Sequence, residues 1–174
     1  GNPGPDFIYG YGRVNARKAL RVIQDTQFFS NSITTNDTLT YTISLPAGVN
    51  KFSAMLYWTD KEGSTNASKA LVNNLDFEVT DLTGATTYQP WVLDPTPNTT
   101  TLLYGATRGV DTLNNAEQVT LNAPSSGDYR FTVYGTNIPQ GPQTFYIVYA
   151  MDMEKNPIAF PHENAKLTPG ANYV

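Results

Sequence analysis

Apolar and polar residues alternate along several short stretches after residue 27, which is the pattern of half-buried β-strands. In "TLTYTISL", residues 38–45, every second position is apolar and the positions between them are Thr or Ser. Further strands are predicted over residues 51–58, 75–81, 86–93, 117–122 and 129–135. The stretch "TFYIVYAM", residues 144–151, is apolar at nearly every position and predicts a strand buried on both faces. Pro90 places an edge or a bulge in the strand that contains it.

Residues 94–115 carry a weaker pattern, in which short strands are expected at "TLLY", residues 101–104, and near Val110. Turn-forming stretches such as "PAGVN" and "APSSGD" separate the predicted strands at short, regular intervals. About eight strands spaced in this way predict an all-β fold, a jelly-roll-like β-sandwich.

The only helical period lies near the start of the chain. Ala16, Ala19, Leu20 and Ile23 fall on one face of a helix predicted over residues 14–23, and Asn15 is a suitable N-cap. A helix this short is marginal in water by itself, so its apolar face needs a partner. We therefore expect the helix to have been shaped by contact with another folded surface.

Composition narrows the possible functions. The chain has 174 residues, of which 40% are hydrophobic and 15% charged, and its net charge is −4. With no basic patch, nucleic acid is not an expected partner, and no apolar run is long enough to cross a bilayer. There are no cysteines, so the sequence contains no disulfide, no thiolate metal site and no cysteine nucleophile.

Several motifs together resemble a known family. "YGYGRVNARKAL", with Gly10, Gly12 and Asn15, resembles the segment that closes the catalytic domain of subtilisin-like serine proteases. "LYWTDKEGS", "ALVNNLDFEVTDLTG" and "APSSGDYRFTVYGTNIPQGPQTF" resemble the P-domain-like β-sandwich that follows that domain in many such proteases. The resemblance covers residues 4–150. It implies that residues 1–26 are the C-terminal tail of a protease domain that is not part of this chain.

The same resemblance implies the remaining organisation. Residues 27–153 would form an accessory β-sandwich domain, and residues 154–174 a linker or the start of a further β domain. The family's catalytic motifs, D-[ST]-G, H-G-T and G-T-S-M-A, do not occur, and the only histidine is His162 in the tail. We therefore expect no proteolysis by this chain itself. The parent protein would be a subtilisin-like serine endopeptidase, secreted or at the cell surface.

In this interpretation the chain is a non-catalytic module that packs on the protease domain, stabilises it and contributes to substrate access. One face should then show an apolar patch that the protease domain covers. Polypeptide or glycan substrates are the further expected partners. The alternative is an autonomous carbohydrate- or protein-binding module, for which an exposed row of aromatic side chains around a groove would be the evidence.

A calcium site is one of two interpretations of a group of oxygen-bearing residues. Carboxylate and amide oxygens, the ligands that calcium prefers, gather at Asp60, Asn74 and Asp76. Related modules often hold calcium, although Asn74 stands where the family commonly has Asp. In the alternative interpretation, which we favour for each of these residues, Asp60 caps a turn, Asn74 satisfies backbone groups of the loop, and Asp76 belongs to a solvated strand face.

Aromatic residues supply the candidates for ligand binding. Trp58 ends a predicted strand and is expected in the core, whereas Trp91, beside Pro90, is the better candidate for an exposed binding residue. Aromatic side chains in a sandwich fill the core more often than they bind ligand, so both roles remain open for Trp91.

Overall fold

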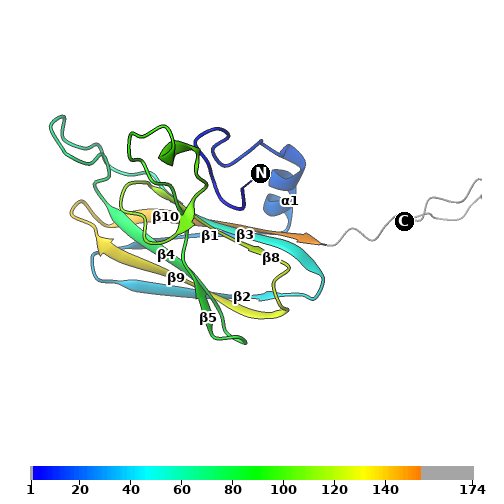
Figure 1. Ribbon diagram of the computed structural model, residues 1–174. Helices are drawn as coiled ribbons and strands as arrows, with labels where there is room; N and C mark the ends of the chain where they lie inside the picture. The colour runs from blue at the N-terminus through cyan, green and yellow to red at the C-terminus, as the bar shows by residue number, and fades with distance from the viewer. Residues whose placement is uncertain (1, 154–174) are drawn as a thin grey trace, which may run out of the picture.

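The computed structural model describes residues 2–153, which form a two-layered β-sandwich with one short α-helix on its outside (Figure 1). The elements in chain order are α1 (Ala16–Gln24), β1 (Phe28–Ile33), β2 (Thr38–Leu45), β3 (Val49–Trp58), β4 (Asn74–Asp81), β5 (Thr86–Tyr88), β6 (Trp91–Val92), the 3-10 turn η1 (Thr101–Leu103), β7 (Thr107–Arg108), β8 (Ala116–Asn122), β9 (Gly127–Asn137) and β10 (Gln143–Met153). The predicted third segment, residues 154–174 with His162, lies outside the described residues.

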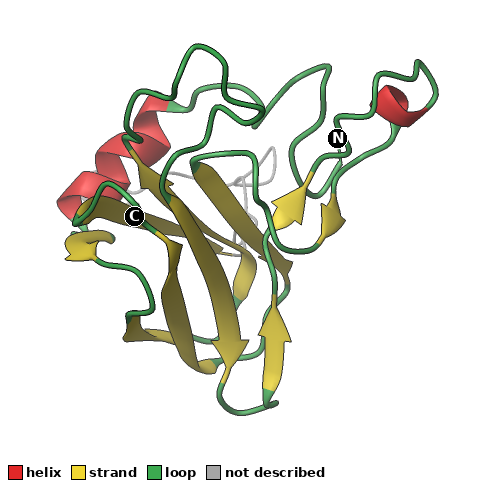
Figure 2. Ribbon diagram, turned by 90° about the vertical axis from the view of Figure 1, so that its left-hand side faces the viewer, coloured by secondary structure: helices red, strands yellow, loops and turns green. Residues whose placement is uncertain are grey.

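Eight of these strands make the two layers. One sheet has the order β1-β10-β3-β8 and the other β2-β9-β4-β5, and every neighbouring pair is antiparallel. Numbered from one to eight along the chain, the strands have the order 1-8-3-6 in one layer and 2-7-4-5 in the other, which is the jelly-roll arrangement. The predicted all-β sandwich is therefore confirmed. β6 and β7 form a separate two-stranded ladder beside it (Figure 2).

The core lies between the layers because alternate side chains of each strand point inward. In β4, Leu75, Phe77 and Val79 are fully buried, and in β9 Phe131 and Val133 are as well. The largest fully buried side chain is Trp58, as the sequence predicted. Phe131 packs against four further aromatic rings, those of Phe29, Phe52, Phe77 and Tyr149.

Two expectations for single elements are wrong. Residues 101–103, predicted as a strand, form the 3-10 turn η1, whereas the short strand expected near Val110 is present slightly earlier, as β7. β10 is not buried on both faces. Its inward residues Phe145 and Ile147 are fully buried, but Tyr146 and Val148 point outward and remain 46% and 40% exposed.

The N-terminal residues lie across the outer side of the β1-β10-β3-β8 sheet, and α1 contacts β10 (Figure 1). No residue of α1 is buried, and Leu20 and Ile23 are 54% and 63% exposed. Within residues 2–153, no helix is long and apolar enough to span a membrane.

Candidate functional site

The outer side of the β1-β10-β3-β8 sheet carries an apolar surface, which we call the outer apolar face. It consists of Phe28, Met55, Tyr57, Tyr146 and Val148. The strand register places these side chains together, because Val148 lies opposite Phe28 on one side and Met55 on the other, and Tyr146 lies opposite Tyr57. Four of the five are at least 40% exposed. A contiguous exposed apolar patch of this kind is typical of an interaction surface.

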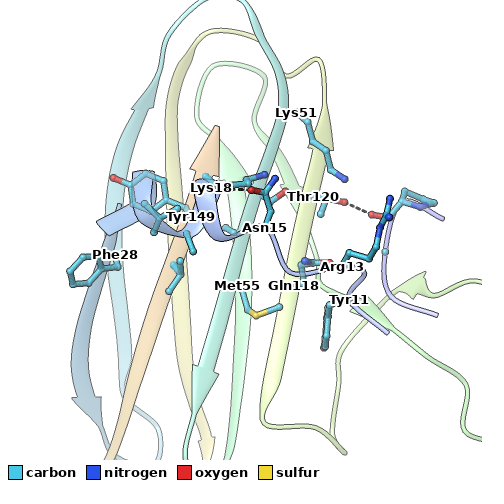
Figure 3. A pocket seen from close by; sticks show the side chains of 18 of the residues that line it. Tyr11, Arg13, Asn15, Lys18, Phe28, Lys51, Met55, Gln118, Thr120 and Tyr149 are labelled. Atoms are coloured by element: carbon cyan, nitrogen blue, oxygen red, sulfur yellow. Dashed lines mark hydrogen bonds between the residues drawn. The ribbon is translucent and has the colours of Figure 1, made fainter. Parts of the chain in front are cut away.

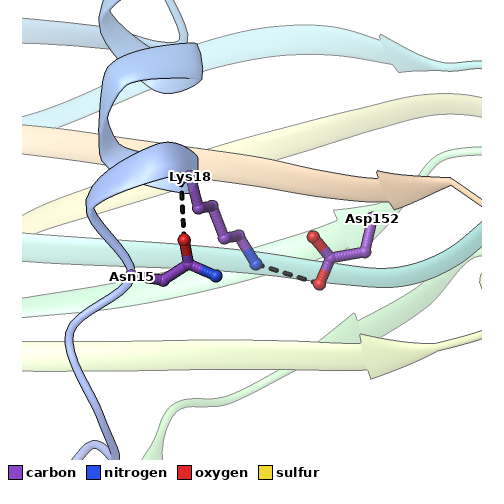
Figure 4. Close-up of polar contacts among 3 residues, drawn as sticks. All are labelled: Asn15, Lys18 and Asp152. Carbon is purple, nitrogen blue, oxygen red and sulfur yellow. Dashed lines mark hydrogen bonds and ion pairs between the residues drawn. The ribbon is translucent and has the colours of Figure 1, made fainter.

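The N-terminal segment is held over this sheet by a few polar contacts. Asn15 caps α1, with its Oδ1 accepting the backbone N–H of Lys18 at 3.0 Å, and the Lys18 ammonium pairs with Asp152 of β10 at 3.0 Å (Figure 4). Farther along, the Tyr11 hydroxyl donates to the Ala116 carbonyl oxygen at 3.3 Å. These contacts are largely exposed, so each contributes little to holding the segment in place.

A groove of about 740 Å³ lies between this segment and the sheet (Figure 3). Met55 and Val148 line it from the sheet, and Ala19 and Val22 line it from α1. Its charged lining residues are Arg13, Lys18 and Lys51, and no carboxylate lines it. The volume and the apolar lining with a few polar groups are typical of a binding groove.

Asp60, the first predicted metal ligand, is used by the protein backbone. Its two carboxylate oxygens accept the N–H groups of Val72 and Asn73 at 2.7 and 2.9 Å. Asn73 is fully buried and bonds Gln140 and Gln143 at the β9–β10 connection. The carboxylate therefore closes the long loop between β3 and β4, which is the role that the turn-capping alternative gave it.

Asn74 and Asp76, the other two predicted ligands, lie on the same side of β4 and are half-buried. The Thr136 hydroxyl donates to Oδ2 of Asp76, whereas Oδ1 of Asp76 and Oδ1 of Asn74 are buried without a partner among the described residues. Burial raises the pKa of Asp76, and the nearby Glu78 and Asp111 carboxylates raise it further. Asn74 and Asp76 therefore lie together on β4, whereas Asp60 binds the backbone of the loop before that strand.

Sequence reasoning missed Glu117, a buried acidic residue of β8 whose side chain reaches β4. It is 1% exposed, and its Oε2 accepts the Phe77 N–H at 2.8 Å. Burial, together with Asp76 and Asp111, raises its pKa to about 9. The signal was present in "EQVTLN", because strand alternation places residue 117 on the same inward face as Val119 and Leu121.

Trp91, the predicted binding residue, is half-buried in β6. Its Nε1–H donates to Thr120 Oγ1 at 2.8 Å, and the Arg108 guanidinium lies over the ring, 3.8 Å from its centroid. Gly4 lies against the same indole so closely that a β-carbon there would overlap it. The ring is therefore engaged by the protein itself, and a ligand-binding role for Trp91 stays a prediction.

Comparison with known proteins gives a distant sequence relationship, and no protein-family model matches the chain. The chain is 33% identical over 110 residues to "Serine protease/ABC transporter B family protein tagD" of Dictyostelium discoideum, and 33% identical over 105 residues to tagB of the same organism. These alignments cover 59% and 55% of this chain but only 6% and 5% of the two relatives. The chain is thus similar to a small segment of each protein.

Solved structures give weaker likenesses. The propeptide form of the Bacillus licheniformis lipase BlEst2 superposes with a TM-score of 0.43 at 9% identity, over 74% of this chain and 22% of that one. The pre-peptidase C-terminal domain of the Bacillus anthracis collagenase gives 0.39 at 13% identity, over 71% and 87%. Both TM-scores are too low to establish a shared fold, so the architecture rests on the strand order.

Proposed function

We propose that this chain is a non-catalytic C-terminal module of a secreted subtilisin-like serine endopeptidase, and that it stabilises the catalytic domain by packing against it. The observation that carries the proposal is the 33% identity to segments of two proteins whose names include serine protease. The motifs of residues 10–19, 56–64 and 70–84 support the subtilisin-like assignment. The chain spans a small part of those relatives, so the activity belongs to the parent protein in this proposal.

The outer apolar face supports a docking role. A strand of an isolated sandwich gains little from apolar side chains that point to water. On β10, however, Val148 points outward between Phe28 and Met55, and Tyr146 points outward beside Tyr57. Burying such side chains against another domain contributes about 25 cal/mol for each Å² removed from water. The catalytic domain is the partner that we assign to this surface.

The exposed apolar residues of α1 support the same arrangement. Leu20 and Ile23 remain more than half exposed although the helix lies over the sheet. In the proposed parent, α1 is the last helix of the catalytic domain, and its apolar residues pack into that domain. The groove between α1 and the sheet would then lie at the junction of the two domains, where it could border the path of a polypeptide substrate.

The test compares the parent protease with and without residues 27–153. The expected result is a shorter half-life of proteolytic activity at elevated temperature after the deletion, and an unchanged half-life would exclude the stabilising role.

Point variants of the intact parent locate the contact. Val148→Asp on the outer apolar face should shorten the half-life, because it places a charge in the proposed interface. The control is Thr40→Asp on the outward side of the other sheet, which should leave it unchanged. If both variants behave alike, the outer apolar face is not the docking surface.

A further inference from the structure

Thr120 is buried although its side chain points away from the core. Strand alternation in β8 places residues 117, 119 and 121 on the inward face, so Thr120 faces outward on the edge strand of its sheet. It is nevertheless only 6% exposed. Trp91 of β6 and Pro3 of the N-terminal segment both bond its hydroxyl. The start of the described chain is therefore packed on the outside of the sandwich at this point.

The hydroxyl of Thr120 is fully used by these two contacts. The indole Nε1–H of Trp91 donates to Thr120 Oγ1 at 2.8 Å, and Oγ1 donates to the Pro3 carbonyl oxygen at 2.9 Å. A hydroxyl has one hydrogen, and an indole can only donate, so the contact with Trp91 leaves that hydrogen for Pro3. Trp91 therefore orients the hydroxyl toward the N-terminal segment.

Arg108 of β7 holds the indole in place. Its guanidinium lies 3.8 Å from the centroid of the Trp91 ring and donates to the backbone carbonyl oxygens of Gln89 and Thr120. Because it binds the backbone of β8 and also stacks on the indole, Arg108 fixes Trp91 against this strand. The site is thus built before any segment binds to it.

The segment that meets this site has a suitable sequence, since residues 2–5 read "NPGP". Proline fixes its own φ and favours extended backbone in the residue before it, so this segment is biased toward the polyproline conformation. Gly4 lets the backbone approach the indole, because a β-carbon there would lie 2.5 Å from Cγ of Trp91. Pro5 is buried. Docking of proline-rich segments on aromatic side chains is a recurring mode of peptide recognition.

The residues that follow add little to this attachment. Four apolar side chains of the next turn are 47–95% exposed, those of Phe7, Ile8, Tyr9 and Val14. The turn is closed by backbone hydrogen bonds between Asp6 and Gly10, which do not involve the sandwich. Residues 3–5 are therefore a main anchor of the segment ahead of α1.

We propose that Trp91, Arg108 and Thr120 form a binding site for an extended Pro-Gly-Pro segment, and that the sandwich uses it to hold the segment that precedes the last helix of the catalytic domain. The first part concerns this chain alone. The second part rests on the proposed function, in which residues 1–26 belong to the catalytic domain. The site is then a contact between the two domains at a different place from the outer apolar face.

The first test follows hydrogen exchange in the purified chain. Thr120→Val removes the hydroxyl and keeps the β-branched shape, so the bonded amides of Asp6 and Gly10 should exchange at least about fivefold faster as the anchor is lost. Thr120→Ser keeps the hydroxyl and should leave both amides protected. Unchanged exchange in β3 and β9 shows that each variant is folded. Equal exchange in the Val and Ser variants would overturn the proposal.

Gly4→Ala is an independent variant on the other side of the contact. It places a β-carbon against the indole, so it should speed exchange as Thr120→Val does. The matched control is Gly109→Ala, because the new β-carbon there makes only an ordinary contact with Val92. If the two alanine variants exchange alike, the close approach of Gly4 to Trp91 does not hold the segment.

The second test asks whether the site binds the segment as a separate peptide. A segment on a short tether has an effective concentration on the order of 1 mM, so a site that holds it within the chain must bind the free peptide at about that concentration. In the Gly4→Ala variant, the peptide Asn-Pro-Gly-Pro-Asp-Phe should shift the indole N–H resonance of Trp91 saturably and leave that of the buried Trp58 unchanged. The same peptide with Ala in place of Gly should not bind. No shift at about 10 mM, well above the effective concentration, would overturn the site.

The intact parent tests the second part of the proposal. Gly4→Ala should shorten the half-life of proteolytic activity at elevated temperature relative to Gly109→Ala. If deletion of residues 27–153 shortens that half-life and Gly4→Ala does not, the contact between the domains is refuted while the proposed function stands. If the deletion itself has no effect, the proposed function fails, and the peptide-binding site is still decided by the tests on the purified chain.

Discussion

The indole Nε1–H of Trp58 donates a hydrogen bond of 2.9 Å to the backbone carbonyl oxygen of Asn73, and both residues are fully buried. Asn73 in turn donates to Gln143 Oε1 at 2.7 Å and to the Gln140 carbonyl oxygen at 3.2 Å. The end of β3, the beginning of β4 and the β9–β10 connection are thereby joined. A core tryptophan thus fixes the position of the long loop between β3 and β4.

Replacing Trp58 by Phe should destabilise the chain by about 1–3 kcal/mol beyond the loss of packing, because the Asn73 carbonyl oxygen would remain buried without its donor. Urea denaturation followed by circular dichroism measures the free energy of unfolding. The control is Tyr57→Phe, one position earlier on the exposed face, which should change that free energy by less than about 0.5 kcal/mol. Equal effects of the two substitutions would contradict the role given to the Trp58–Asn73 bond.

Gly135 in β9 should not tolerate a side chain. A β-carbon there would collide with the carbonyl oxygen of Thr34, while the Gly135 N–H donates to the Asp37 carbonyl oxygen at 2.9 Å and its own carbonyl accepts from Asn36. The two nearest atoms that the new β-carbon would meet, the carbonyl oxygen and carbonyl carbon of Thr34, belong to the backbone and cannot move aside easily. Gly135→Ala should therefore cost more than about 2 kcal/mol. Gly109→Ala, where the new β-carbon would make an ordinary contact with Val92, is the control and should cost much less. Thermal melts of the two variants decide the comparison.

The backbone amides of α1 should exchange with solvent faster than those of β3 and β9. No residue of α1 is buried, and its ion pair to β10 is only partly buried, so the helix can open without unfolding the sandwich. Hydrogen exchange followed by mass spectrometry or NMR tests this expectation. Lys18→Gln should speed exchange in α1 and leave exchange in β3 unchanged. Protection of α1 equal to that of the central strands would show that the helix is an integral part of this fold.

Strict alternation predicted the strands well where one face of a strand is buried. The stretch predicted over residues 38–45 is β2 with the same bounds, because its Thr and Ser positions face water. β1 was not predicted as a strand, because "FFSNSI" is polar in its middle and only Ile33 is buried. β1 is held in the sheet by pairing with β10, more than 100 residues later in the chain, and the local pattern of apolar residues does not predict such a distant pairing.

The candidate sites likewise combine features that local sequence predicts with features that depend on contacts between distant segments. The motif around residues 60–76 gathered three predicted ligands, yet the roles of Asp60 and Asp76 depend on which backbone groups reach them. Glu117 reaches the Phe77 N–H of β4 only because β8 and β4 belong to opposite sheets, and no local pattern predicts that contact. The outward exposure of Tyr146 and Val148 was also not predictable from composition, because an apolar strand looks alike whether its second face meets the core or a partner.

The Asp37 carboxyl should titrate below its ordinary range. The Thr34 hydroxyl and then the Thr34 backbone N–H donate to its Oδ2, at 2.5 and 3.0 Å, which favours the charged form and lowers the pKa of Asp37. Its contribution to stability is therefore present above the pKa of an unfolded aspartate, and is lost as the pH falls through the lowered pKa. In Thr34→Val only the backbone donor remains, so the pKa of Asp37 should rise. NMR titration measures it, and the pKa of Asp94, lowered by Thr96, should not change in that variant.

Ile147 and Val148 are neighbours on β10, and substitution should destabilise the chain much more at Ile147 than at Val148. Ile147 is fully buried between the sheets, so Ile147→Ala should cost about 2–5 kcal/mol in the isolated chain. Val148→Thr keeps the β-branched shape and suits a strand, and since the side chain is 40% exposed it should cost less than about 1 kcal/mol. Chemical denaturation of both variants gives the two values. If Val148→Thr proved as costly as Ile147→Ala, the outer apolar face would be needed for folding, and its apolar character would no longer argue for a partner. A small cost for Val148→Thr would instead show that the sandwich folds without that apolar character, and would support the proposed binding role of the outer apolar face.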